Sequence, residues 1–203
     1  RPTPLFRAER WEKHLETPAR IFYKYEGASS TGNYEANTAI PQAYFAFKEG
    51  VSRLVTATST GEMGISLAVA CNYFGLQCKI YMVRSAHDEK EQGRHLMEIL
   101  GAEVVPSPSQ EHDAGREALA RDPNHPGNLS LAVSEAFYEA LGDEMTKFCW
   151  GTVANHCVLH QTIVGLEARL QMKKVKAYPD IIMGTVGGGS AFGGLVLPFY
   201  RDS

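Results

Sequence analysis

The chain of 203 residues is 44% hydrophobic and 21% charged, which allows a sizeable core and argues against disorder. Its formal net charge is −3 and its basic residues form no stripe, so we expect neither a nucleic-acid partner nor a membrane-surface partner. No apolar run approaches the roughly 20 residues of a membrane span. The four cysteines lack Cys-x-x-Cys spacing, which favours free buried thiols in a reducing compartment, the cytoplasm, over disulfides or a zinc site.

Runs with strand character alternate with runs of helical periodicity along the chain. In chain order we expect a helix at 6–15, a strand at 19–25, a helix at 34–48, a strand at 53–57, a helix at 65–74, a strand at 78–83, a helix at 87–100, a strand at 102–105, helices at 111–121, 130–141 and 152–174, a buried strand at 181–186 and the start of a helix at 192–199. Asn33 is placed to cap the helix 34–48. This alternation is typical of an α/β fold with a mostly parallel sheet.

Three loops after predicted strands are rich in Gly, Ser and Thr: 27–33, 58–64 and 187–190. Ligands of parallel sheets bind beyond the carboxyl ends of the strands, so the three loops together predict a small phosphate-bearing ligand. The loop Gly187-Gly-Gly-Ser190 stands between a predicted strand and a helix N-terminus, where several N–H groups point the same way. It is interpreted as a phosphate cradle; the alternative is a glycine-rich turn that binds nothing.

The chain resembles the β subunit of tryptophan synthase, and more closely the long, subunit-independent branch of that family of fold-type II pyridoxal-phosphate enzymes. The stretches that carry the resemblance run from the first residue almost to the last: 1–5, 23–27, 37–42, 53–56, 101–108, Asn155-His156, 159–162, 165–167 and 187–190. Proteins of the family are about twice as long, and both ends of this sequence look cut. We therefore expect it to be part of a longer protein.

The resemblance implies two three-layer parallel-sheet domains with pyridoxal phosphate held between them. Residues 1–33 and 175–203 would belong to the C-terminal, phosphate-side domain, and 34–174 to the N-terminal domain with its mobile segment. The family reaction is a β-replacement that joins indole to serine, and the implied assembly is a homodimer or a heteromer with a related chain. The cofactor phosphate would lie on Gly187, Gly188, Gly189 and Ser190, next to Ala191, where the family usually has Asn.

The chain departs from the family at the Schiff-base lysine. The family pattern Ser-His-Lys-x-Asn corresponds here to Asn33-Tyr34-Glu35-Ala36-Asn37. Glu35 stands at the lysine position and Tyr34 at that of a phosphate-contacting histidine. A carboxylate cannot form an imine with the cofactor aldehyde, and it repels the phosphate, so pyridoxal phosphate would bind without a covalent link.

A second departure affects the acid–base and substrate-binding positions. The family stretch Glu-Thr-Gly-Ala-Gly-Gln corresponds here to Ala57-Thr58-Ser59-Thr60-Gly61-Glu62. Ala57 has no proton to transfer. Thr58, Ser59, Thr60 and Gly61 still offer hydroxyl and N–H groups to an anion, whereas Glu62 places a negative charge where the family has a neutral amide.

Three interpretations stay open. Our leading hypothesis is a lyase or transferase of different chemistry on a phosphate-bearing or amino-acid-like ligand, with Glu35 and Glu62 as general acid and base. The rival is a non-catalytic pseudoenzyme or partner subunit, and the third is that another lysine, Lys24, takes over. His156 and His160 share a helix face at a spacing that can bind zinc, but packing or hydrogen bonding is the favoured role, so we expect no metal site.

Overall fold

The computed structural model describes residues 2–200, and the chain divides into two compact units. The first unit comprises residues 1–37 with 152–203, and the second comprises residues 38–151. This division places residues 152–174 in the first unit, whereas the resemblance places them with the N-terminal domain. The family-based domain boundaries stay a prediction.

The second unit is built on a four-stranded parallel sheet in the order β5-β4-β3-β6. Its strands are β3 (Arg53–Thr58), β4 (Gln77–Val83), β5 (Ala102–Ser107) and β6 (Thr146–Phe148). The expected α/β class with a parallel sheet is thereby confirmed. Sequence reasoning missed β6, because its three residues carry no alternation long enough to signal a strand.

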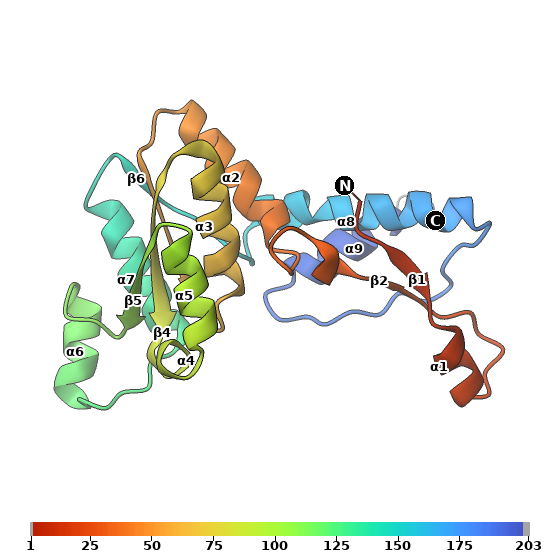
Figure 1. The fold of residues 1–203 in the computed structure, drawn as a ribbon, viewed down its shortest axis with the longest axis horizontal. Helices are drawn as coiled ribbons and strands as arrows, with labels where there is room; N and C mark the ends of the chain where they lie inside the picture. Colours follow the sequence, from red (N-terminus) through yellow and green to blue (C-terminus); the bar gives the residue numbers. More distant parts are fainter. Residues whose placement is uncertain (1, 201–203) are drawn as a thin grey trace. The chain divides into compact units, whose positions relative to one another are not determined.

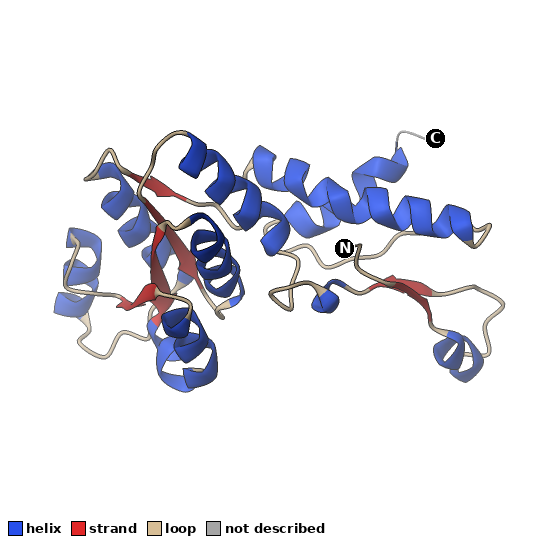
Figure 2. Ribbon diagram, turned by 45° about the horizontal axis from the view of Figure 1, so that its top comes forward, coloured by secondary structure: helices blue, strands red, loops and turns tan. Residues whose placement is uncertain are grey.

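Helices cover both faces of this sheet (Figure 2). One apolar cluster joins Leu54 and Ile80 of the strands to helices α2 (Ala36–Lys48), α3 (Glu62–Phe74) and α5 (Glu91–Ile99). The opposite cluster joins Val55 and Tyr81 to α7 (Leu129–Leu141). Neighbouring residues of one strand point to opposite faces, so the continuous apolar runs of the sequence serve both clusters.

Some helices begin or break at other residues than expected. The helix expected at 87–100 is two helices, α4 (Arg84–Glu89) and α5, and α6 spans Asp113–Arg121. α2 begins at Ala36, three residues after Asn33, whose Oδ1 accepts the N–H of Glu35 at 2.7 Å and closes a turn that ends directly before the helix. Asn side chains favour such local bonds, and the local turn here takes the place of the expected cap.

The first unit contains a two-stranded antiparallel sheet and a pair of long helices (Figure 1). The strands are β1 (Leu5–Arg7) and β2 (Phe22–Lys24), joined through α1 (Glu9–His14), and a short 3-10 turn, η1 (Glu26–Ala28), follows. The expected helix at 6–15 is thus a strand followed by a shorter helix. The long helices are α8 (Asn155–Lys174) and α9 (Ser190–Tyr200). Gly165 of α8 and Gly194 of α9 have no side chain, which lets the two helices approach closely. A Cβ at either position would overlap atoms of the other helix.

The strand expected at 181–186 is absent from the described residues. This segment has no regular secondary structure and pairs with no strand of the described residues, and Ile181, Met183 and Val186 are 79%, 84% and 64% exposed. A strand needs a hydrogen-bonding neighbour, and within the described part of the chain β1 and β2 pair only with each other. Of the three small-residue loops, therefore, only 58–64 follows a parallel strand.

Candidate functional site

The glycine loop of the first unit is shaped by its contact with Thr152. Gly189 has φ +92°, which only glycine adopts readily, and α9 begins at the next residue. A Cβ at Gly188 would overlap the side chain of Thr152. Ser190 is fully buried, and its Oγ lies 3.0 Å from Oγ1 of Thr152. The loop therefore packs on Thr152 at Gly188 and bonds to it through the Ser190 hydroxyl.

This arrangement is suited to an anion. The first N–H groups of a helix have no intrahelical acceptor, and they lie at the positive end of the helix dipole. Beside them, the hydroxyls of Ser190 and Thr152 are bonded to each other, which leaves the pair one hydroxyl hydrogen to donate. Sequence reasoning missed Thr152, because it precedes the loop by more than thirty residues and no local pattern marks it.

A cavity of about 160 Å³ lies beside the N-terminus of α9. Its wall is formed by residues of the first unit: Lys24, Glu26, Tyr34, Gln161, Val164, Gly184, Thr185, Ala191, Phe192 and Leu195. The predicted cofactor-site residues Tyr34 and Ala191 are thus brought together here. Gln161 fixes the wall from a fully buried position, because its amide donates to the Tyr34 carbonyl at 3.0 Å and accepts from Asn37 at 3.1 Å.

Lys24 lines the cavity but is committed to structural contacts. Its Nζ lies 2.6 Å from Oε2 of Glu167, 2.7 Å from the Thr3 carbonyl and 3.2 Å from Oε1 of Gln171, and its side chain is 5% exposed. These three acceptors use all the hydrogens of a protonated amine. Lys24 therefore ties the N-terminal segment to α8, and its geometry does not suit a nucleophile.

Glu35 immediately follows the cavity residue Tyr34 and precedes α2. The residue is half-buried, and its Oε2 is buried. The bond from its N–H to Asn33 fixes the backbone at this point.

The other candidate loop belongs to the second unit. β4 lies on one side of β3 and β6 on the other, so the loop after β3 stands at the point where the strand order reverses. Thr58 is buried and accepts the N–H of Gly61 at 3.0 Å, and Gly61 has φ +109°. Ser59, Thr60 and Glu62 are exposed, and the Thr60 hydroxyl donates to the Glu62 carboxylate. Ala57 packs in the core cluster under α7.

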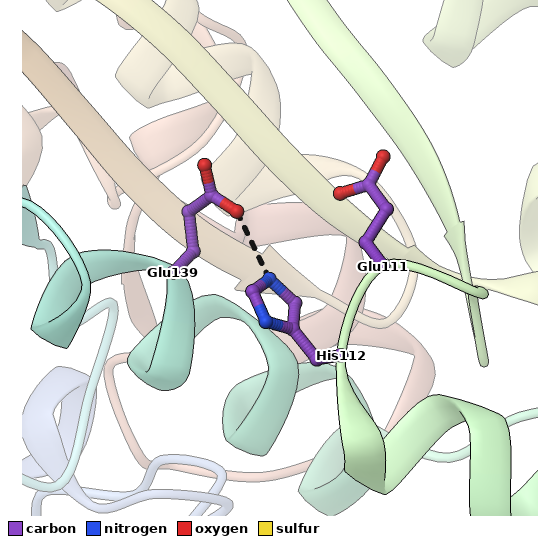
Figure 3. A group of neighbouring side chains, drawn as sticks. All are labelled: Glu111, His112 and Glu139. Atoms are coloured by element: carbon purple, nitrogen blue, oxygen red, sulfur yellow. Dashed lines mark hydrogen bonds and ion pairs between the residues drawn. The ribbon is translucent and has the colours of Figure 1, made fainter.

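One group of side chains in the described residues has the composition of a metal site: Glu111, His112 and Glu139 (Figure 3). Its ligand atoms all lie within 4.8 Å of one another. The Lys79 ammonium already lies 2.8 Å from Glu111 and 3.5 Å from Glu139, and Arg53 lies 2.8 Å from Glu139. These two internal cations balance the carboxylates, so the group is better suited to holding α7 on the sheet than to holding an ion.

The histidines on α8 form a contacting pair whose ring centroids are 5.8 Å apart. Burial, and secondarily the neighbouring His156, lower the pKa of His160. His160 is therefore neutral at pH 7, which agrees with the packing role favoured from the sequence. All four cysteines are buried, and none of them forms a disulfide.

The fold is α/β, with a glycine loop directly before the helix α9. The family model for pyridoxal-phosphate dependent enzymes matches residues 1–203, and the chain belongs to this family. It is 50% identical over 202 residues to a tryptophan synthase beta chain 2 of Methanosarcina mazei and 52% identical to a tryptophan synthase beta chain of Pyrococcus horikoshii. Each alignment covers 100% of this chain and 46% or 44% of the relative, so the chain spans about half the length of these relatives.

Solved structures share the fold at low sequence identity. A fungal L-serine ammonia-lyase from Rhizomucor miehei matches with a TM-score of 0.78 at 15% identity, over 99% of this chain and 56% of that chain. A threonine deaminase matches with a TM-score of 0.76 at 19% identity, over 99% of this chain and 56% of that chain. The expected fold-type II architecture is confirmed.

The residues fit one end of the family cofactor and not the other. A phosphate suits the loop 187–190, where the helix presents its first N–H groups beside the hydroxyl pair of buried Ser190 and half-buried Thr152. A covalent link does not fit this cavity, because its one wall lysine, Lys24, is held by three acceptors.

Proposed function

We propose that this chain is a diverged tryptophan synthase β-like protein that binds a phosphate-bearing or amino-acid-like ligand without a covalent lysine link. The observation that carries the proposal is the hydroxyl pair of buried Ser190 and half-buried Thr152 beside three glycines at the start of α9. Family membership makes pyridoxal phosphate the first ligand to test. The cofactor supplies an electron sink for carbanions when it is bound.

Some residues of the chain bind the ligand, and another removes the covalent link to it. The N–H groups at the start of α9 and the hydroxyls of Ser190 and Thr152 hold the phosphate. Tyr34 and Phe192 line the neighbouring cavity and present ring surface to the rest of the ligand. Glu35, in place of the lysine expected from the resemblance, removes the usual covalent anchor, so we do not expect β-replacement on serine by that route.

Glu35 and Glu62 are the proposed proton-transfer groups of a lyase- or transferase-type reaction. Each carries a carboxylate where the family has a different group, and Glu62 receives a hydrogen bond from Thr60. Replacing either residue by Ala should lower any detected turnover by about 10²-fold or more, as for loss of a general acid or base. Unchanged turnover in both variants would remove them from the mechanism.

Trapping with borohydride tests the absence of a lysine link. The chain is mixed with pyridoxal phosphate, its absorbance spectrum is recorded, and the sample is reduced and digested for mass spectrometry. We expect bound cofactor to be released intact on denaturation, and Ser190→Ala to weaken its binding. Stoichiometric modification of one lysine would refute the proposal and identify that lysine.

A second candidate function, a non-catalytic partner subunit, is favoured by the exposed apolar segment 181–186. A surface of this kind marks contact with another polypeptide. Sedimentation of the chain alone and with a lysine-bearing family member separates the two candidates. A stable heteromer with no turnover of its own supports the partner function, whereas turnover by the chain alone excludes it.

A further inference from the structure

The first unit has a second and larger cavity, an apolar groove of about 700 Å³. Helices α8 and α9 line it together with the stretch 19–24, which includes β2, and the segment 177–184. Most of the described side chains along it are apolar or small, and the charge of Lys24 is balanced by Glu167 at 2.6 Å. The groove is therefore suited to apolar side chains rather than to a charged ligand.

The segment 178–188, part of which lines this groove, has backbone groups that pair with nothing. Within the described part of the chain, none of these residues takes part in a backbone hydrogen bond. Ile181 and Met183 are 79% and 84% exposed, although a short apolar run of this kind is typical of a buried strand. Unpaired N–H and carbonyl groups beside apolar side chains can pair with a strand of another polypeptide.

The small sheet of the first unit is incomplete in the same way. Within residues 2–200, β1 and β2 pair only with each other, so each strand has one open edge. Figure 1 shows both strands and the segment that leads into α9 on the same side of α8. A two-stranded sheet is marginally stable by itself, and a layer of helices needs a second layer against its apolar face. The groove therefore lies where a larger sheet would cover α8 and α9.

The longer relatives contain a polypeptide that could form such a sheet. The aligned stretch covers 46% and 44% of the two tryptophan synthase beta chains, so more than half of each lies outside it. A second copy of this chain, by contrast, would bring only the same two-stranded sheet and the same open groove.

We infer that this groove is the docking surface for the polypeptide that the longer relatives carry outside the shared stretch, and that 181–186 joins the sheet of that polypeptide as a strand. Main-chain hydrogen bonds to 181–186 and burial of its apolar side chains would hold the two together. The inference goes beyond the proposed function, because it concerns a contact with protein and requires no ligand.

Production of the two polypeptides as separate chains in one cell tests the inference. The 203-residue chain is combined with the part of the Methanosarcina mazei relative that lies C-terminal to its aligned stretch. We expect a stable 1:1 complex in size-exclusion chromatography with light scattering. Amide hydrogen exchange of 181–186 should slow by about 10²-fold or more relative to the chain alone, because a paired backbone exchanges only when it opens.

Ile181→Asp and Ile99→Asp form a matched pair of variants. The two isoleucines are 79% and 81% exposed, but Ile181 lines the groove, whereas Ile99 ends α5 in the second unit. Ile181→Asp should weaken the complex by about tenfold or more, because docking would bury a charge, and Ile99→Asp should leave its affinity unchanged. Circular dichroism verifies that both variants fold.

Two results would overturn the inference: absence of the complex, or equal weakening by the two variants. Slowed exchange of 181–186 in a homodimer of the chain alone would also overturn it and would assign the groove to a second copy. Ligand binding is measured on the chain without this polypeptide, so failure of the docking surface leaves the proposed function standing, and failure of ligand binding leaves the docking surface standing.

Discussion

Gly188 shows at the scale of one residue why the loop needs glycine. A Cβ there would overlap the Thr152 side chain, which is hydrogen-bonded to buried Ser190. We expect Gly188→Ala to destabilise the chain by about 1–3 kcal/mol, as overpacking does, and to weaken phosphate binding because the hydroxyl pair is displaced. Urea unfolding and calorimetry with inorganic phosphate measure the two effects.

Gly187 is the matched control for this variant. A Cβ at Gly187 meets nothing within 4 Å, and its backbone is not among the left-handed glycines. Gly187→Ala should therefore change the free energy of unfolding by no more than about 0.5 kcal/mol. Equal destabilisation by the two variants would contradict the role given to Thr152.

Glu135 is a buried carboxylate with a structural task. It is fully buried and accepts hydrogen bonds from the Ser107 hydroxyl, from the Ser109 N–H at 2.9 Å and from the Ser109 hydroxyl at 2.6 Å. Glu135→Ala leaves these donors without an acceptor and opens a cavity, so we expect a loss of about 3 kcal/mol or more in urea unfolding. The exposed control Glu144→Ala should leave the free energy of unfolding nearly unchanged. An equal loss in the two variants would show that the hydrogen bonds of Glu135 contribute no stability.

At the scale of an element, α7 is held on the sheet by charges as well as by apolar packing. Ala132 and Ala136 belong to the apolar cluster, and one turn further Glu139 contacts Arg53, Lys79 and His112. Periodicity alone predicts the apolar contacts of this helix. The ionic contacts of Glu139 could not be predicted from the sequence, because its partners come from β3, β4 and the loop before α6.

The pKa of Glu139 makes this contact sensitive to acid. Burial acts to raise the pKa, but the hydrogen bond from His112, the attraction of Lys79, the hydrogen bond from Tyr81 and the attraction of Arg53 together hold it below its ordinary value. A carboxylate with a lowered folded-state pKa stabilises the fold above its unfolded pKa. That stability is lost as pH falls through the folded-state pKa, below the ordinary value of 4.5.

Removing the Lys79 charge should shift acid unfolding. In Lys79→Met the pKa of Glu139 rises toward its ordinary value, so the midpoint of acid unfolding, followed by circular dichroism, should move to higher pH. Lys147→Met is the control, because Lys147 pairs with Glu49 at the surface and both side chains are at least half exposed. Surface ion pairs contribute little to stability, so this control should keep the wild-type midpoint of acid unfolding. An equally large shift in the control would contradict the role given to Lys79.

At the scale of the whole molecule, the two units differ in how far their backbone is shielded from proteases. The sheet of the second unit is buried between helices, whereas the segment 177–189 of the first unit forms no helix or strand and is largely exposed. We expect limited thermolysin digestion to cut first near Ile181, Met183 or Val186, because exposed backbone without a strand partner opens at little cost. Mass spectrometry of the early fragments checks this, and early cuts within β3 or β4 would contradict it.

The sequence by itself determined the α/β class, the glycine loop at the start of α9 and the positions of the candidate carboxylates Glu35 and Glu62. These follow from local periodicity, from the conformational freedom of glycine and from the identity of single residues. The tertiary structure alone decided that 181–186 is unpaired, that Thr152 supports the loop and that Lys24 is a structural ion pair. The physical reason is that a strand's neighbour and a buried group's hydrogen-bond partner come from residues far apart in the chain, which no local pattern specifies.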